Sequence, residues 1–158
     1  MNTMFRNGNI FKQWVNRLPE KHIFIFDLDK TLWNCAIDHN ITPKDIYDQC
    51  PKERHYMLTH IQEKGHELNI GSRSNEPDKC KVLLRYLFPN ITFNNIQIFP
   101  TPKTKREHVS NIINGRDINN FIVFDEEIHI LEDLKKIYPG CQVFHTINGL
   151  CYETFEKT

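Results

Sequence analysis

Two aspartates lie two residues apart at the end of an apolar run, in the segment Phe24-Ile25-Phe26-Asp27-Leu28-Asp29. The run from 22 to 28 is typical of a buried strand, and a chain that turns out of the sheet after Leu28 can aim both carboxylates at one point. Asp27 is ionised near neutral pH, so it can attack phosphorus without the help of a base. Asp29 can protonate the leaving oxygen and then deprotonate water, provided that its pKa is raised. The pattern therefore indicates phosphoryl transfer through Asp27.

An ordinary structural role is the alternative for these residues. Asp and Thr after a strand often cap a following helix, and the hydroxyl of Thr31 can hold the turn. The four apolar residues that precede Asp27 favour the catalytic interpretation.

Apolar runs that alternate with helical patterns predict a parallel sheet wrapped by helices. We expect strands at 22–28, 67–71, 91–99, 120–124 and 142–145, and helices at 51–64, 77–88, 104–114 and 127–138. Thr42 and Pro43 are expected to begin an irregular stretch. The helix that Pro77 opens is expected to bury Val82, Leu83, Tyr86 and Leu87. The predicted fold is a doubly wound, five-stranded α/β sheet with right-handed crossovers.

Polar residues follow three further predicted strands, where sites form in sheets of this kind. Ser72 and Arg73 come after the second strand, Lys103 after the third, and Asp125 with Glu126 after the fourth. Each has a plain alternative: a helix cap, a solvated lysine, and acids favoured at a helix N-terminus. Their occurrence together, in order and each at a strand end, favours a phosphate site.

These motifs resemble those of the haloacid dehalogenase superfamily of phosphatases, whose first motif is a strand followed by Asp-x-Asp-x-Thr. The resemblance implies that Ser72 binds the phosphoryl group and that Lys103 neutralises the phosphate and the nucleophile. It also implies a Mg²⁺ ion held by the side chains of Asp27 and Asp125 and by the carbonyl of Asp29, a set of hard oxygen ligands that suits magnesium.

Lys105 and Arg106 compete with Lys103 for the lysine role. Lys103 is preferred because its distance from Phe99 and Pro100 matches the family.

Within the superfamily the chain is most similar to the small magnesium-dependent phosphatases of eukaryotes. The shared features are Asp27-Leu28-Asp29 before Thr31-Leu32-Trp33, the Ser72-Arg73 step, the approach of Phe99-Pro100 to Lys103, the run 124–127, and the ending from His145 to Leu150. The resemblance covers 23–150 and implies activity on phosphotyrosine. Glu126 stands where the group usually has a second Asp, which leaves the outer metal shell open. Lys30 replaces a residue that is often Gly or aromatic.

The motif spacing also bears on the substrate. The intervals from Asp29 to Ser72 and from Ser72 to Lys103 hold a crossover helix and loops, but no cap domain. The site is therefore expected to be open and to accept protruding phosphates. We expect Thr31, Ser72 and Arg73 to bind the substrate, with the Arg73 guanidinium placed for an anionic group or for stacking on an aromatic leaving group.

A chain of 158 residues, 39% hydrophobic and 25% charged, fits one globular domain, predicted at 22–158. Residues 1–21 form an extension in which five apolar side chains share a helical face: Ile10, Phe11, Trp14, Val15 and Leu18. We expect this helix to dock on the domain. A transit peptide is the alternative, because the stretch is basic and lacks an acid before Glu20.

The bulk composition limits the partners. Twenty basic residues balance 20 acidic ones, which argues against nucleic acid as a partner, and no apolar run is long enough to cross a membrane. Five scattered cysteines favour free thiols in a reducing compartment, hence a cytoplasmic location.

The predicted activity is hydrolysis of phosphate monoesters. The alternatives are a phosphatase for nucleic-acid ends, a phosphoserine phosphatase, and a binding protein on a fold that has lost catalysis. The intact set of Asp27, Asp29, Lys103 and Asp125 argues against lost catalysis.

Overall fold

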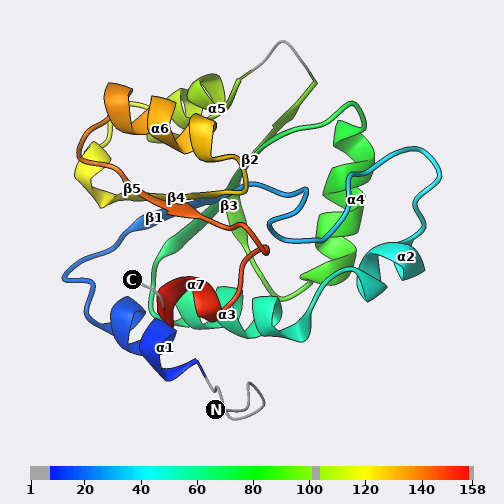
Figure 1. The fold of residues 1–158 in the computed structure, drawn as a ribbon, viewed down its shortest axis with the longest axis horizontal. Coiled ribbons are helices and arrows are strands. Elements are labelled where there is room, and N and C mark those ends of the chain that lie inside the picture. The colour runs from blue at the N-terminus through cyan, green and yellow to red at the C-terminus, as the bar shows by residue number, and fades with distance from the viewer. Residues whose placement is uncertain (1–7, 101–103, 157–158) are drawn as a thin grey trace.

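A computed structural model describes residues 8–100 and 104–156, and its centre is a sheet of five parallel strands in the order β3-β2-β1-β4-β5. Helices cover both faces of the sheet (Figure 1). The strands are β1 (Ile23–Phe26), β2 (Glu67–Arg73), β3 (Phe93–Phe99), β4 (Phe121–Asp125) and β5 (Gln142–His145). The helices are α1 (Asn9–Asn16), α2 (Pro43–Asp48), α3 (Lys52–Glu63), α4 (Pro77–Leu87), α5 (Lys105–Ile113), α6 (Ile128–Ile137) and α7 (Glu153–Glu156). The prediction of a doubly wound five-stranded parallel sheet is confirmed.

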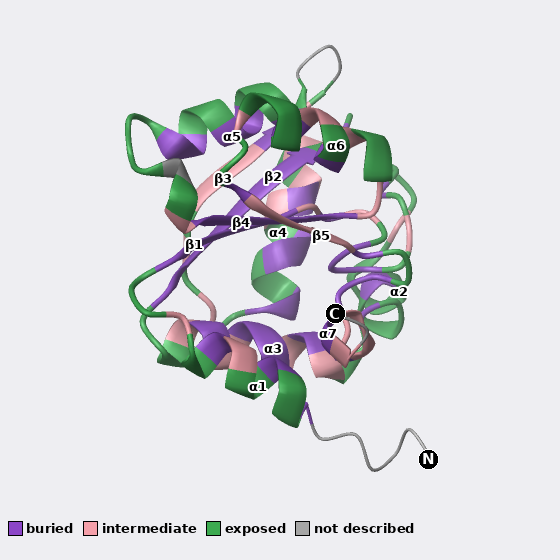
Figure 2. Ribbon diagram, turned by 60° about the vertical axis from the view of Figure 1, so that its left-hand side comes forward, coloured by how far each residue is buried: buried purple, intermediate pink, exposed green. Residues whose placement is uncertain are grey.

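Side chains of β1 alternate between two cores, as the two-residue period of a strand requires. Ile23 and Ile25 belong to the core under α5 and α6, whereas Phe24 and Phe26 belong to the larger core on the opposite face. Figure 2 shows the buried sheet between two helical layers whose outer sides are exposed. The four consecutive apolar residues of β1 are thus explained by burial on both faces.

Stacked aromatic rings form one part of the larger core, beside many aliphatic side chains. The rings of Phe26 and Phe124 lie 5.0 Å apart, and those of Phe124 and Phe144 lie 5.1 Å apart. Phe155 of α7 and Trp14 of α1 cover this stack, with ring centroids 4.9 Å apart. The first and last helices described therefore close one face of the sheet together.

Two short helices differ from the sequence prediction. The stretch that Thr42 and Pro43 begin is helical rather than irregular, because Thr42 and Asp45 form a reciprocal capping box and Pro43 occupies the first turn. The four-residue helix α7 was also not expected; it buries Phe155. Neither helix is long enough for a clear apolar period.

The predicted inner face of α4 is wrong in part. Leu83 and Leu87 are buried as expected, but Val82 and Tyr86 are exposed, and the helix instead buries Cys80 and Leu84. In α1, likewise, Phe11 and Val15 are buried while Ile10 is 51% exposed. In both helices there are more apolar residues than positions that face the core, so some of the apolar side chains are exposed. No helix in the described ranges has the length and apolar character that a membrane span needs.

His66 links α1 to the base of the sheet. Its Nδ1 accepts a hydrogen bond of 3.0 Å from the backbone N–H of His22, and its ring is largely buried. Burial is the main cause that lowers the pKa of His66, and the neighbouring His22 and His60 lower it further, against a hydrogen bond to the backbone of Val15. A proton on Nδ1 would also remove the bond from His22.

We therefore expect the stability that the neutral His66 contributes to be lost as the pH drops below about 6.5, the pKa of a histidine in the unfolded chain. Because the folded-state pKa is lower, the unfolded chain binds more protons in that window, and acid favours unfolding. His66→Gln should show a shallower fall of Tm between pH 7.5 and 5 than the parent chain. His39→Gln, at an exposed position, is the control. Parallel curves for the parent and His66→Gln would contradict this account.

Candidate active site

The parallel register of β1 and β4 places two aspartates side by side. Phe26 pairs with Phe124, and the N–H of Asp27 donates to the carbonyl of Phe124 over 3.1 Å. Asp27 therefore leaves β1 next to the point where Asp125 ends β4. Both residues lie at the carboxyl edge of the sheet, where doubly wound folds place their sites.

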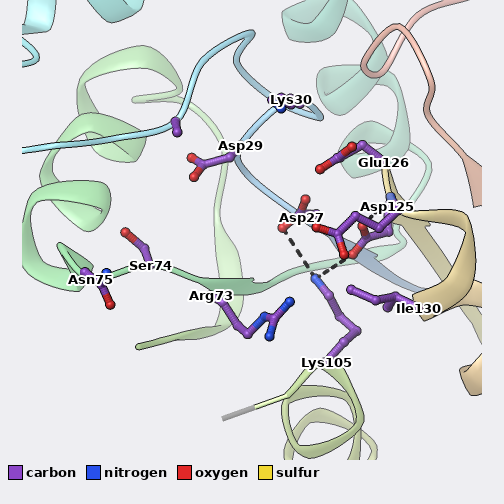
Figure 3. Close-up of a pocket in the computed structure, with 12 residues that line it drawn as sticks. Asp27, Asp29, Lys30, Arg73, Ser74, Asn75, Lys105, Asp125, Glu126 and Ile130 are labelled. Atoms are coloured by element: carbon purple, nitrogen blue, oxygen red, sulfur yellow. Dashed lines mark hydrogen bonds and ion pairs between the residues drawn. The ribbon is translucent and has the colours of Figure 1, made fainter. Parts of the chain in front are cut away.

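The ammonium group of Lys105 lies between these two carboxylates (Figure 3). Its Nζ is 3.1 Å from Asp125 Oδ2 and 3.5 Å from Asp27 Oδ1, and the side chain is only 5% exposed. It also donates a hydrogen bond to the carbonyl of Gly71. A Cβ at Gly71 would lie 3.2 Å from the Cβ of His108 in α5, so the glycine lets this helix approach β2 closely.

Asp125 is fixed from two directions. Its Oδ1 accepts the backbone N–H of Glu127 over 2.9 Å, while its other oxygen faces Lys105. Its carbonyl accepts the N–H of Thr146 over 2.9 Å. The carboxylate is 2% exposed, so its orientation depends on these contacts rather than on solvent.

Burial raises the pKa of Asp27 to about 7, and the negative charges of Asp125 and Asp29 act in the same direction. Lys105 opposes this effect. The pKa of Lys105 is itself raised: burial lowers it, but the attraction of Asp27 and Asp125 outweighs burial. One lysine thus only partly compensates two buried carboxylates, and a further cation would stabilise their charged forms.

Asp29 lies beyond Asp27 in a separate environment. Its Oδ1 accepts a 2.8 Å hydrogen bond from Nε1 of the fully buried Trp33. Burial raises its pKa, although the bond from Trp33, a backbone bond from Ile37 and the charge of Lys30 lower it. In Figure 3 its carboxylate points away from Asp27. A half-buried carboxyl with a raised pKa suits an acid that must also act as a base.

The donor set fits a hard divalent cation. Asp27 and Asp125 present carboxylate oxygens at one place, and oxygen is the ligand that Mg²⁺ prefers. Within 8–100 and 104–156, no group of three or more His, Cys, Asp or Glu side chains gathers as a metal site. A cation here would need backbone, water or substrate oxygens as well, which is usual for Mg²⁺.

A cavity of about 350 Å³ opens over these residues. Arg73, Ser74 and Asn75 line one side of it, and Lys30 and Ala36 line another. Ser74 accepts hydrogen bonds from the N–H of Glu76 and from the thiol of Cys80. Glu126 and Glu127 complete the acidic part of the wall.

The predicted site residues fall into three groups. Asp27, Asp29, Arg73 and Asp125 line the cavity together. Thr31 and Ser72 do not: Thr31 is fully buried with its hydroxyl 3.0 Å from that of Thr146, and Ser72 is 1% exposed. Lys103 lies outside the described residues, and it is Lys105 that contacts both carboxylates.

The family comparison decides the identity. The model of the Acid Phosphatase family matches residues 18–158, nearly the whole chain. The chain belongs to this family. It is thereby a phosphatase of the haloacid dehalogenase type, as its motifs predicted.

A solved structure shares the fold of this acid phosphatase. It is the N-terminal part of the protein BF1531 from Bacteroides fragilis, which contains a phosphatase domain complexed with Mg. The sequences are 14% identical and the TM-score is 0.56. At this identity the match supports the fold alone, and it covers 82% of this chain but only 37% of the other. No curated protein matches the chain.

The sequence contained signals for the cavity residues that were not predicted. β2 extends to Arg73 rather than ending at Gly71, which keeps Ser72 inside the sheet and brings Ser74 to the cavity. Thr104 caps α5 through the N–H of Glu107, so the residue after this cap starts the helix and faces β2. A search for an N-cap would have favoured Lys105. Trp33 follows Asp29 by four residues, and the tight turn between them brings the indole to the carboxylate.

Trp33→Phe tests whether the indole N–H positions Asp29. A hydrogen bond to a charged group contributes about 1.5–3 kcal/mol. We expect kcat for phosphate release to fall by roughly tenfold to a hundredfold if this bond orients the acid. Trp14→Phe is the matched control, because Trp14 packs on Phe144 and Phe155 away from the cavity. Equal losses of kcat in both variants would show that only packing matters.

Proposed function

We propose that this acid phosphatase is a magnesium-dependent enzyme that hydrolyses phosphate monoesters through a phospho-aspartate on Asp27. The observation that carries the proposal is the contact of the Lys105 ammonium with the carboxylates of Asp27 and Asp125, 3.5 and 3.1 Å away, at the carboxyl edge of the sheet. The side chains of Asp27 and Asp125 and the carbonyl of Asp29 would hold Mg²⁺. When bound, Mg²⁺ offsets the repulsion between an anionic nucleophile and an anionic phosphate.

In the first step, a carboxylate oxygen of Asp27 forms a bond to phosphorus as the bond from phosphorus to the ester oxygen breaks. Asp29 donates its proton to the departing oxygen, which leaves as the alcohol. Lys105 stabilises the negative charge on the transferred group. We assign this role to Lys105 rather than to Lys103, because Lys105 is buried against both carboxylates.

In the second step, Asp29 accepts a proton from water as the water oxygen attacks phosphorus. The bond between phosphorus and Asp27 breaks, inorganic phosphate leaves, and the carboxylate of Asp27 is restored. Asp29 regains the proton that it lost, so one catalytic cycle consumes one ester and one water. The hydrogen bond from Trp33 keeps Asp29 in place for both transfers.

Substrates with protruding phosphates suit the cavity, and we propose protein phosphotyrosine among them. Only α2 and α3 lie between β1 and β2, and only α4 lies between β2 and β3. Lys30, Ala36, Arg73 and Asn75 on the cavity wall are exposed, so solvent reaches it. The five cysteines are free, which supports a reducing compartment and with it our proposal of a cytoplasmic enzyme.

The first test is phosphate release from p-nitrophenyl phosphate and a phosphotyrosine peptide, with Mg²⁺ and with a chelator. We expect release that the chelator abolishes and Mg²⁺ restores. Asp27→Asn should lower kcat by roughly a thousandfold or more, because an amide is a poor nucleophile. Its Tm should match or slightly exceed that of the parent, since one of two buried like charges is gone. Turnover by folded Asp27→Asn would refute the phospho-aspartate.

A second test separates the two lysines. Lys105→Met should lower kcat by about a hundredfold to a thousandfold, the usual effect of losing one group that stabilises transition-state charge. The fold should survive, because Asp27 can take up a proton when its partner is gone. Lys103→Met should stay within about twofold of the parent. Circular dichroism of both variants checks folding, and the reverse ranking of the two rates would restore Lys103 to the role.

A further inference from the structure

Lys30 has an unusual backbone conformation for its residue type. Its φ is +64°, in the left-handed region that glycine adopts without strain. Among the described residues, one other non-glycine residue has a positive φ: Asn114, at the end of α5, where asparagine is common. Lysine lacks the short polar side chain that helps asparagine in this region.

The turn itself requires this conformation. The carbonyl of Leu28 accepts the N–H groups of Thr31 and Leu32, at 3.0 and 2.8 Å, and the chain between them must fold back sharply. This turn allows Asp27 and Asp29 to line the same cavity. Glycine at position 30 would meet the requirement without strain, so the presence of lysine calls for a function of its side chain.

No ion pair within the described ranges explains the lysine, although its charge acts on the neighbouring Asp29 and lowers the pKa of that carboxyl. The residue is exposed, and within 8–100 and 104–156 no carboxylate lies within ion-pair distance of its ammonium group. Lys105, in contrast, is buried and paired with two aspartates. Two lysines thus line the cavity. Lys105 lies deep and is paired with two aspartates, whereas Lys30 lies exposed at the rim without a direct ion pair in the described ranges.

The position of Lys30 defines what it can contact. It follows Asp29 directly and lines the same cavity, as Figure 3 shows. In the proposed reaction the ester oxygen departs next to Asp29, so the rest of the leaving group passes the rim on which Lys30 lies. Glu126, on the β4 side of the cavity, would repel a second anion there.

We propose that Lys30 is a specificity residue that binds an anionic group on the leaving alcohol. The substrate class is a phosphate monoester with a carboxylate or second phosphate a few bonds from the ester oxygen. A small metabolite and an acidic phosphopeptide share this chemistry. The inference rests on the proposed function, because it takes Asp29 as the acid of the leaving group.

The experiment compares kcat/KM for 3-carboxyphenyl phosphate and 3-carbamoylphenyl phosphate, which have similar shapes and differ in one charge. With the full chain and saturating Mg²⁺ at low salt, we expect a threefold to fivefold preference for the carboxylate, the size of a partly exposed ion pair. Lys30→Met and Lys30→Gly should bring the ratio close to one. Lys136→Met, an exposed lysine on α6 that does not line this cavity, should keep the parent ratio.

Two further readouts separate charge from strain. The preference of the parent should shrink as salt rises from about 0.05 to 0.5 M, because screening weakens an exposed ion pair. Lys30→Gly should raise Tm above that of Lys30→Met, since only glycine relieves the left-handed strain.

Phosphotyrosine peptides with Glu or Gln before the phosphotyrosine identify the source of the anionic group. A preference for the Glu peptide that depends on Lys30 supports a peptide substrate, whereas the absence of this preference supports a small molecule.

A parent chain without preference, or a ratio unchanged in Lys30→Met, would overturn the proposal for Lys30 while leaving the phosphatase mechanism intact. A parent chain that hydrolyses neither aryl phosphate would overturn the proposed function and this inference with it.

Discussion

Two carboxylates and one ammonium group share a buried place at the edge of the sheet, and this ion cluster constrains everything around it. The register of β1 with β4 brings Asp27 and Asp125 together, and close packing of α5 on Gly71 brings Lys105 to them. Removing one partner of such a cluster leaves an uncompensated buried charge, which is strongly unfavourable. The sheet register, the glycine and the helix cap must therefore be correct together, and no single one of them suffices.

The positions of the chemistry were largely readable from the sequence, because strand ends in a doubly wound sheet converge by topology. Asp27, Asp29 and Asp125 required only the order of strands and the rule that sites form at carboxyl ends. The exact neighbours of those ends were harder to predict. Whether Ser72 or Ser74 lines the cavity depends on the residue at which β2 ends. A sequence pattern locates the end of a strand only to within a few residues.

The helices and strands, like the site residues, were predictable from the sequence only in part, because apolar periodicity identifies some elements and not others. Strands with apolar residues at every position, such as β1, were clear. In α4 the sequence offers more apolar residues than one face can bury. The packing of the helix on its neighbours, among them α2 and β3, decides that Leu84 is inside and Tyr86 outside. The short helices α2 and α7 depend on a capping box and on one buried phenylalanine, signals too local for a helical period.

The closure of the aromatic face by α1 and α7 has a consequence for biosynthesis. Phe11 contacts Phe155 with ring centroids 4.8 Å apart, although these residues come from the first and last helices described. A ribosome delivers the α1 side of this contact early and the α7 side only after all five strands. Until then, Trp14, Phe124 and Phe144 lack the part of their cover that Phe155 provides. Contacts that span so much sequence slow folding and leave apolar surface available to chaperones or to other nascent chains. The vulnerable period of this protein thus lies in synthesis, before α7 has left the ribosome.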